Sequence, residues 1–170
     1  MPRVTRATPG ALEALGAQLE NALERLWAAW HPVDRDVIDS HGLTPRQWTL
    51  LRRLCESTKR EIPMGSLATH LGLTPSGVTR CADPLVVRGL VERVLYPGDR
   101  RVCCLKPTET GLDLWRTIVR EATALACHCL QHLTPQDREG VVRAVELLAA
   151  AAEEEAQRLF PHRRPVPEGR

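Results

Sequence analysis

Residues 62–111 read IPMGSLATHLGLTPSGVTRCADPLVVRGLVERVLYPGDRRVCCLKPTETG, and this stretch decides the fold. Its apolar spacing predicts a short helix from about Met64 to His70, and Gly72 follows at a position where a helix end favours positive φ. Thr74 and Pro75 then suit the N-cap and the first position of a second helix, because the N–H that proline lacks has no intrahelical partner there. Two helices joined by so short a turn containing Gly are typical of a helix-turn-helix.

The hydrophobic pattern changes from helical spacing to alternation after Gly89. Alternating side chains from Val91 to Tyr96 predict a strand, and Pro97-Gly98-Asp99 has the residue types of a tight turn. Arg101 to Lys106 then predict the returning partner strand. Aromatic residues make up only 4% of the chain, while Ala, Leu, Arg and Glu are abundant, which favours helix elsewhere. We therefore predict a winged helix-turn-helix within a mainly α protein.

The second helix of a helix-turn-helix lies in the DNA major groove, with its first residues toward the base edges. Arg100 and Arg101 at the tip of the predicted wing suit phosphates or a narrow minor groove. Asp99 would repel a phosphate, so we expect it to accept hydrogen bonds from a neighbouring arginine and hold that guanidinium in place. The candidate DNA-binding residues are Thr74, Ser76, Gly77, Thr79, Arg80, Asp99, Arg100 and Arg101.

Positive charge is concentrated in the same part of the chain. Residues 44–107 contain 11 Lys/Arg and 5 Asp/Glu, whereas residues 1–43 contain 4 and 6, and residues 108–170 contain 8 and 10. Nucleic-acid affinity comes largely from such cations, because they displace counterions from the phosphates. Scattered, solvated arginines are the alternative explanation, but the predicted fold favours a DNA-binding surface.

Four motifs in and around this region occur in the order typical of one known family. They are Gly42-Leu43-Thr44, Arg88-Gly89-Leu90-Val91-Glu92-Arg93, Pro97-Gly98-Asp99-Arg100-Arg101 and Thr108-Glu109-Thr110-Gly111. With these motifs the chain resembles, over nearly its whole length, the MarR family of bacterial winged-helix regulators. The resemblance implies a homodimer that binds DNA. For many members it also implies a pocket whose small phenolic or lipophilic ligand releases the DNA.

Helical patterns flank this unit on both sides. Thr-Pro precedes four predicted helices, at 8–9, 44–45, 74–75 and 134–135, each time as an N-cap followed by proline at the first helical position. An apolar stripe predicts a first helix from about Pro9 to Trp30, which His31-Pro32 should interrupt before a short continuation to Gly42. The other predicted helices run from Pro45 to about Ser57, from Thr108 to about His132, and from Pro135 to about Leu159. The proline-rich, charged stretch 161–170 predicts disorder.

The apolar stripes of the terminal helices are too extensive to be buried by so small a winged domain. Packing against the same helices of a second copy would bury them, which predicts a twofold homodimer. Such a dimer places two second helices about one turn of DNA apart, so we expect a pseudo-palindromic operator. The alternative is a monomer whose three helices cap one domain. The predicted division is an N-terminal dimerisation helix (1–43), a winged helix-turn-helix DNA-binding domain (44–107), C-terminal dimerisation helices (108–160) and a disordered tail (161–170).

A small-molecule effector is a further predicted partner. Its candidate pocket, which the family resemblance implies, lies between the dimerisation helices and the winged domain. The candidate lining residues are Trp27, Trp30, His31, Trp48 and Trp115. Apolar residues at helical spacing are more often ordinary core, which is the alternative for each of them. The predicted function is a repressor released by a small aromatic or lipophilic ligand.

The cysteines raise the alternative of a thiol- or metal-responsive sensor on the same fold. Cys103 and Cys104 are adjacent in a predicted strand, so they point to opposite faces. Cys127 and Cys129 lie about 200° apart around a helix, so they do not share a site. A buried cysteine usually behaves as a small hydrophobic residue. Cys81, in the second helix of the helix-turn-helix, is the thiol whose modification would most directly disturb DNA binding.

Neither the histidines nor the first helix strengthens this alternative. His128 and His132 are four residues apart on one helical face, a spacing found in metal sites, but the sequence indicates no third or fourth ligand. Near a helix C-terminus both also interact favourably with the helix dipole. Some members of the family that the chain resembles sense oxidants through a cysteine in the first helix, whereas this chain has none before Cys55. We predict no metal site.

Two prolines depart from the family pattern. Pro84 falls inside the second helix of the helix-turn-helix, where it removes a bond to the carbonyl of Arg80 and should kink the helix after its base-reading turns. Pro107 follows the second wing strand and should end that strand early. Neither change removes a DNA-contacting side chain.

Several classes of protein are disfavoured. No apolar run approaches the roughly 20 residues of a membrane span, and no signal-peptide core is present, so we expect a cytoplasmic protein with reduced thiols and no membrane partner. No glycine-rich phosphate loop, nucleophile elbow or metalloprotease helix occurs, so we predict no enzyme, catalytic residue or cofactor. A winged-helix module that binds protein would differ from our prediction by lacking salt-dependent binding to duplex DNA.

Overall fold

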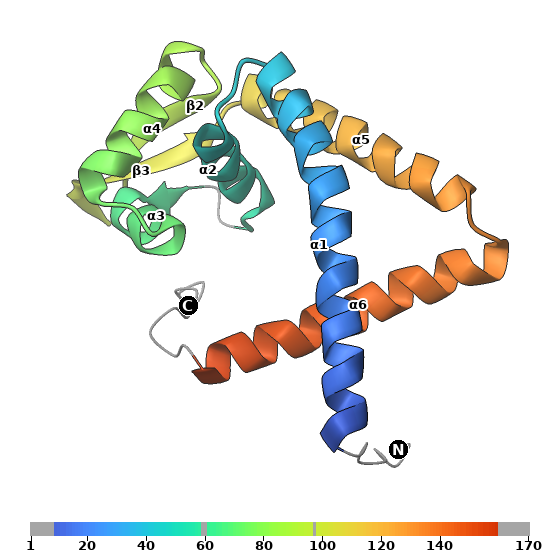
Figure 1. The fold of residues 1–170 in the computed structure, drawn as a ribbon. Coiled ribbons are helices and arrows are strands. Elements are labelled where there is room, and N and C mark those ends of the chain that lie inside the picture. The colour runs from blue at the N-terminus through green and yellow to red at the C-terminus, as the bar shows by residue number, and fades with distance from the viewer. Residues whose placement is uncertain (1–8, 59–60, 97, 160–170) are drawn as a thin grey trace.

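The protein is described by a computed structural model that covers residues 9–58, 61–96 and 98–159, without the side chains of Pro9 and Arg100. Its elements are α1 (Pro9–Ser40), α2 (Pro45–Glu56), β1 (Ile62–Pro63), α3 (Met64–Leu71), α4 (Pro75–Val87), β2 (Val91–Tyr96), β3 (Asp99–Pro107), α5 (Glu109–Gln131) and α6 (Pro135–Leu159). The predicted fold class is confirmed, since helices dominate and a helix-turn-helix is followed by a β-hairpin wing. Figure 1 shows this winged part gathered at one end, with α1 and α5 running away from it.

The wing belongs to a three-stranded antiparallel sheet in the order β1-β3-β2. Val91 pairs with Pro107 at one end of the β2–β3 ladder, so the prediction that Pro107 ends the strand early is wrong. Proline is tolerated there because the adjacent bond between the two strand ends comes from the N–H of Thr108, which donates to the Leu90 carbonyl at 3.1 Å, so Val91 and Pro107 form a non-hydrogen-bonded pair. Strand β1 was not predicted. It has two residues, too few for any alternation to show, and exists because Ile62 pairs with Leu105, 43 positions along the chain.

Helix α1 is longer than the sequence predicts. It continues through Pro32 to Ser40, so the expected interruption at His31-Pro32 is wrong. The proline removes one backbone hydrogen bond, but Pro32 is exposed and water can bond the freed carbonyl. Packing holds the helix on the far side of the proline, because Val37 and Ile38 lie against the core of the winged part.

Threonine caps begin the helices as the sequence predicts. Thr44 and Gln47 form a capping box, with bonds of 2.8 Å from Thr44 N to Gln47 Oε1 and 3.3 Å from Gln47 N to Thr44 Oγ1. Thr74 and Thr134 cap α4 and α6 through bonds of 3.1 and 3.3 Å from the backbone N–H three residues on. Thr8 lies outside the described residues, as does the stretch 161–170 that was predicted to be disordered.

The hydrophobic core lies in the winged part. Its most completely buried side chains come from α2, α3, α4, the sheet and one residue of α5: Leu50, Leu51, Leu54, Leu67, Val78, Leu85, Val91, Cys104, Leu105 and Ile118. The terminal helices contribute little, since α6 has no buried residue and the apolar stripe of α1 is largely exposed. Among the described helices, none combines the length and the apolar character that crossing a membrane requires.

Candidate functional site

Helix α4 presents the predicted base-reading residues. Gly72 ends α3 with φ 63°, the left-handed conformation that was expected, and Thr74 then caps α4. The hydroxyl groups of two predicted DNA-binding residues, Thr74 and Thr79, already form hydrogen bonds at the start of α4. Thr74 Oγ1 accepts from Gly77 N and lies 3.1 Å from Ser76 Oγ, while Thr79 Oγ1 donates to the carbonyl of Pro75 at 3.1 Å. Ser76 remains exposed on the first turn.

Gly77 keeps the start of α4 close to the turn. A Cβ at this position would lie 3.2 Å from Thr74 Oγ1 and 3.5 Å from Leu73 Cβ. Such a contact is tighter than usual, so a larger side chain would push the capping hydroxyl away from the N–H that it satisfies. The small residue therefore serves the cap of α4 as well as leaving space on the outer surface.

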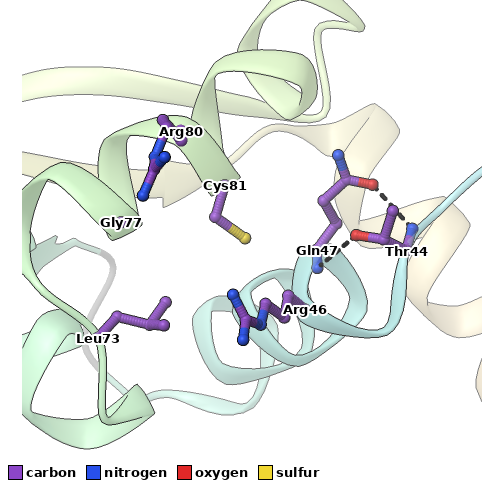
Figure 2. A pocket seen from close by; sticks show the side chains of 7 residues that line it. All are labelled: Thr44, Arg46, Gln47, Leu73, Gly77, Arg80 and Cys81. Carbon is purple, nitrogen blue, oxygen red and sulfur yellow. Dashed lines mark hydrogen bonds between the residues drawn. The ribbon is translucent and has the colours of Figure 1, made fainter.

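A hollow of about 270 Å³ separates α4 from α2 (Figure 2). Arg80 and Cys81 line it from α4, and Arg46 lines it from the first turn of α2. Arg46 was not among the predicted DNA-binding residues. Its position opposite Arg80 depends on how α2 packs against α4, which no local pattern reports. Two guanidinium groups at one opening make it attractive to an anion such as a DNA phosphate.

The thiol of Cys81 points from α4 into this hollow (Figure 2). Burial raises the pKa of the Cys81 thiol, and the nearby Arg46 guanidinium only partly opposes that rise. The neutral thiol therefore predominates at neutral pH, and a neutral thiol is a poor nucleophile. In this state Cys81 acts as a small apolar side chain between α4 and α2.

Asp99, Arg100 and Arg101 lie on the wing as predicted, but Asp99 bonds a different group from the one expected. Asp99 Oδ1 accepts a hydrogen bond of 2.9 Å from the backbone N–H of Arg101. The bond that the structure describes is thus to the backbone, whereas we predicted a bond to a guanidinium. Asp99 orders the turn, which leaves the exposed Arg101 side chain available to a ligand. Arg100 lies beside them in β3, and its side chain is outside the described part of the chain.

Other charged side chains of the winged part form ion pairs that connect its elements. Arg93 of β2 forms an ion pair with Asp83 of α4, which ties the wing to the second helix of the helix-turn-helix. Lys106 pairs with Glu92 across the β2–β3 ladder at 2.8 Å. Carboxylates already balance the positive charge of these two cations. The excess positive charge of residues 44–107 therefore lies on other side chains. Among the described residues, Arg46 and Arg80 are exposed cations that line the hollow, and Arg101 is an exposed cation of the wing.

A second cavity, of about 370 Å³, lies where α1, α2 and α5 meet. Two of the residues predicted for an effector pocket, Trp30 and Trp48, belong to its lining, and so do Asp34 and Arg52, which were not predicted. Asp34 Oδ1 is buried and has no hydrogen-bond partner among the described residues. The cavity touches both the predicted dimerisation helices and the winged part.

The other three predicted effector residues lie outside the lining of this cavity. Trp27 is 65% exposed, and its ring lies 4.6 Å from the ring of His31, centroid to centroid, one turn further along α1. Trp115 of α5 buries its indole Nε1 without a hydrogen-bond partner in the described ranges. Helical spacing places aromatic residues on a face, whereas helix crossings decide which of them border a cavity.

The remaining cysteines and histidines behave as separate residues. Cys104 is buried and Cys103 is partly exposed, in agreement with opposite faces of β3. Burial raises the pKa of Cys55 to about 12, with Glu56 adding to the effect. His128 and His132 are exposed on α5 and at its end. Within the described ranges, no three histidine, cysteine or acidic side chains are grouped closely enough to hold a metal ion.

Comparison with known proteins places this geometry among winged-helix regulators. Residues 41–102 match the model of a family described as MarR family. The HTH-type transcriptional repressor MdtR of Bacillus subtilis (strain 168) is 26% identical to this chain over 141 residues, which are 83% of this chain and 90% of MdtR.

Solved structures share the fold. A MarR family protein from Bacillus stearothermophilus superimposes with a TM-score of 0.73 at 22% identity, over 83% of this chain and 97% of that protein. A mutant of S. aureus MepR bound to an oligodeoxyribonucleotide superimposes with a TM-score of 0.64 at 13% identity, over 79% of this chain and 97% of that one. These similarities extend beyond the matched region to the helices on both sides of it.

Proposed function

Because the chain belongs to the MarR family of winged-helix transcriptional regulators, we propose that it acts as a homodimeric repressor that a small aromatic or lipophilic ligand releases from duplex DNA. The relative MdtR is named as a repressor, and the structural neighbour MepR is bound to an oligodeoxyribonucleotide. Three features of this chain support the three parts of the proposal.

The DNA-binding part rests on α4 and the wing, which carry the proposal. Ser76 and Arg80 are exposed on the first turns of α4, where a helix-turn-helix meets base edges, and Arg101 is exposed on the adjacent hairpin. Arg46 extends the cationic surface to α2 across the hollow. We infer that Arg80 contacts a base, while Arg46 and Arg101 contact phosphates.

The dimeric part rests on apolar side chains that the single chain leaves exposed. They lie along α1 and α6: Leu12, Leu15, Leu19, Leu23, Leu26, Val141, Val142, Val145 and Leu147. A surface of this kind is typical of an interface between copies, because soluble monomers rarely leave contiguous apolar faces in water. A twofold axis would bring the two α4 helices onto one face of the duplex.

The effector part rests on the cavity between α1, α2 and α5. A volume of about 370 Å³ lies in the range of small-molecule sites, and its lining is mainly apolar, with Trp30 and Trp48. A ligand there would contact the dimerisation helices and the winged part at once. Its binding can therefore favour one orientation of α4 relative to the partner copy over another.

A mobility-shift titration with duplex DNA from upstream of the protein's own gene tests the proposal. Binding is expected to weaken steeply with salt. Arg101→Ala should weaken binding to every duplex and reduce the slope of log K against log salt concentration by about one. Arg80→Ala should cost about 1–3 kcal/mol of binding free energy and also relax the preference for particular bases. Arg116→Ala is a suitable control, because Arg116 is exposed on α5 and pairs with Asp113. Equal and small losses from Arg80→Ala and Arg101→Ala would contradict the assignment.

The alternative of a thiol sensor on the same fold receives less support from the site. Cys55, Cys81 and Cys104 all have pKa values raised chiefly by burial, so each is neutral at physiological pH. A redox-sensing thiol normally has a lowered pKa and an accessible sulfur. We therefore favour a small-molecule effector over oxidation as the signal.

A further inference from the structure

Asp34 is an unusual residue for the wall of an apolar cavity. It lies on α1 at the cavity shared with α2 and α5, and its Oδ1 is buried without a hydrogen-bond partner among the described residues. Buried polar atoms in native proteins are bonded in the great majority of cases, because an unpaired carboxylate oxygen loses its hydration without compensation. The described part of the chain supplies no hydrogen-bond donor to this oxygen, and a cation in the cavity would balance the charge of the carboxylate.

The other charged groups lining the cavity do not supply that donor. Arg52 and Glu56 both belong to the lining, but they lie one turn apart on α2 and bond each other, with 2.8 Å between Arg52 Nε and Glu56 Oε1. Their charges compensate one another. Asp34 is therefore the unbalanced charge of the lining, and the cavity has a net negative character.

The rest of the lining suits an aromatic or lipophilic body. Trp30 and Trp48 border the cavity together with Val37, Ile38, Ile118 and Val119. Tryptophan rings attract cations as well as apolar surface, because the face of the indole carries negative charge density. A carboxylate beside two tryptophans combines the two features that recognise an organic cation.

We propose that this cavity binds a cationic aromatic amine, whose ammonium pairs with the Asp34 carboxylate while its ring system lies against Trp30 and Trp48. The inference rests on the proposed function, because it assigns a ligand class to the effector cavity. The proposed pairing with Asp34 also predicts different affinities for ligands of the same shape and different charge. An aromatic carboxylate of the same shape would place a second negative charge beside Asp34, and the two would repel each other.

Three bicyclic probes of matched shape test the charge preference in the full-length chain. Isothermal titration with 2-naphthylmethylamine, 2-naphthylmethanol and 2-naphthoate should give the tightest binding for the amine, by about tenfold or more over the alcohol, and the weakest for the carboxylate. Asp34→Asn keeps the size of the side chain and removes its charge. It should abolish the advantage of the amine and leave the affinity for the alcohol nearly unchanged.

Asp36→Asn is the matched control, because Asp36 is an exposed residue of the same helix and is not part of the lining. It should keep the amine preference of the unchanged chain. The inference is overturned if Asp34→Asn keeps that preference, if the carboxylate binds as tightly as the amine, or if none of the three probes binds.

Duplex binding by the same proteins separates this inference from the proposed function. Without a probe, Asp34→Asn should bind the operator duplex as the unchanged chain does, since Asp34 belongs to α1 and lines the cavity with α2 and α5, and is not a residue of α4 or the wing. If the amine binds in a way that depends on Asp34 but no duplex is bound, the ligand class is supported and only the proposed function is contradicted. Duplex binding together with absent amine binding contradicts the ligand class alone.

Discussion

At the scale of single residues, Gly111 shows how closely α5 approaches the winged part. A Cβ built on Gly111 would lie 2.0 Å from the carbonyl oxygen of Leu90, a backbone atom that cannot turn aside. Thr108 holds the two segments together, because its N–H donates to the Leu90 carbonyl at 3.1 Å and its Oγ1 donates to the Gly89 carbonyl at 2.6 Å. The absence of a side chain at Gly111 is what permits this contact between α5 and the start of β2.

Replacing Gly111 by alanine should therefore destabilise the protein, although alanine normally favours a helix. Relief of the clash requires α5 to move away from Leu90, at a cost of about 3 kcal/mol. Gly140→Ala is the matched control, since Gly140 lies in α6 and a Cβ there meets nothing within 4 Å. It should stabilise by about 0.5–1 kcal/mol. Urea unfolding, monitored by circular dichroism, gives the unfolding free energy of both variants. A Gly111→Ala protein as stable as the unchanged chain would contradict the close contact.

At the scale of elements, Arg88 connects the end of α4 to the end of α1. Its guanidinium donates to the carbonyls of Gly42 and His41, at 2.7 and 2.9 Å. His41 is bonded in turn to Glu121 of α5, with 2.9 Å between Nε2 and Oε2. The turn that follows α1 thus contacts α4 and α5, which the sequence separates widely. These bonds physically connect the region after α1 with α5 and with the helix that is proposed to read DNA.

Arg88→Ala should loosen this connection and cost about 1–2 kcal/mol of unfolding free energy, because two charge-assisted hydrogen bonds to helix-end carbonyls are lost. Arg88→Lys should recover only part of the loss, since one ammonium cannot reproduce the fork of a guanidinium. Arg116→Ala removes an exposed ion pair with Asp113 and should change stability by less than about 1 kcal/mol. Thermal unfolding compares the three, and an Arg88→Ala loss no larger than that of Arg116→Ala would argue against the bridge.

At the scale of the whole molecule, the winged part has a core and the terminal helices do not. Leu19 of α1 is 41% exposed and Val145 of α6 is 55% exposed, although both belong to continuous apolar faces. A single copy gains little by keeping such faces in water. The proposed homodimer explains them, because a second copy offers the same faces and can bury both sets around a twofold axis.

Leu19→Glu and Val145→Glu should each weaken the dimer by at least about 100-fold, because every substitution is present twice and removes burial of a large apolar side chain. Both positions are exposed in the single chain, so far-UV circular dichroism should stay unchanged. Asn21→Asp is the control, since Asn21 lies about 200° around α1 from Leu19. Sedimentation equilibrium gives the association constants. An unchanged chain that sediments as a monomer at micromolar concentration would refute the dimer.

Local chemistry in the sequence was sufficient to predict most of the elements. Thr44, Thr74 and Thr134 cap helices through their own neighbours, and Gly72 takes the left-handed conformation that ends α3. These features depend on atoms only a few residues apart, so composition and spacing reveal them. For the same reason the residues of the helix-turn-helix and the wing could be named in advance, although their contacts with DNA stay predictions.

Contacts between distant segments were beyond the reach of the sequence. Strand β1 forms because Ile62 meets Leu105, and α1 continues past Pro32 because Val37 and Ile38 pack on the winged part. The crossing of α1, α2 and α5 decides which of the predicted aromatic residues border the cavity between these helices, and it also places Asp34 in the lining. The sequence alone determined where the threonine-capped helices begin and where Gly72 ends α3, because those features depend on neighbouring residues. Only the tertiary structure decided which side chains meet, because packing brings together residues that no spacing along the chain relates.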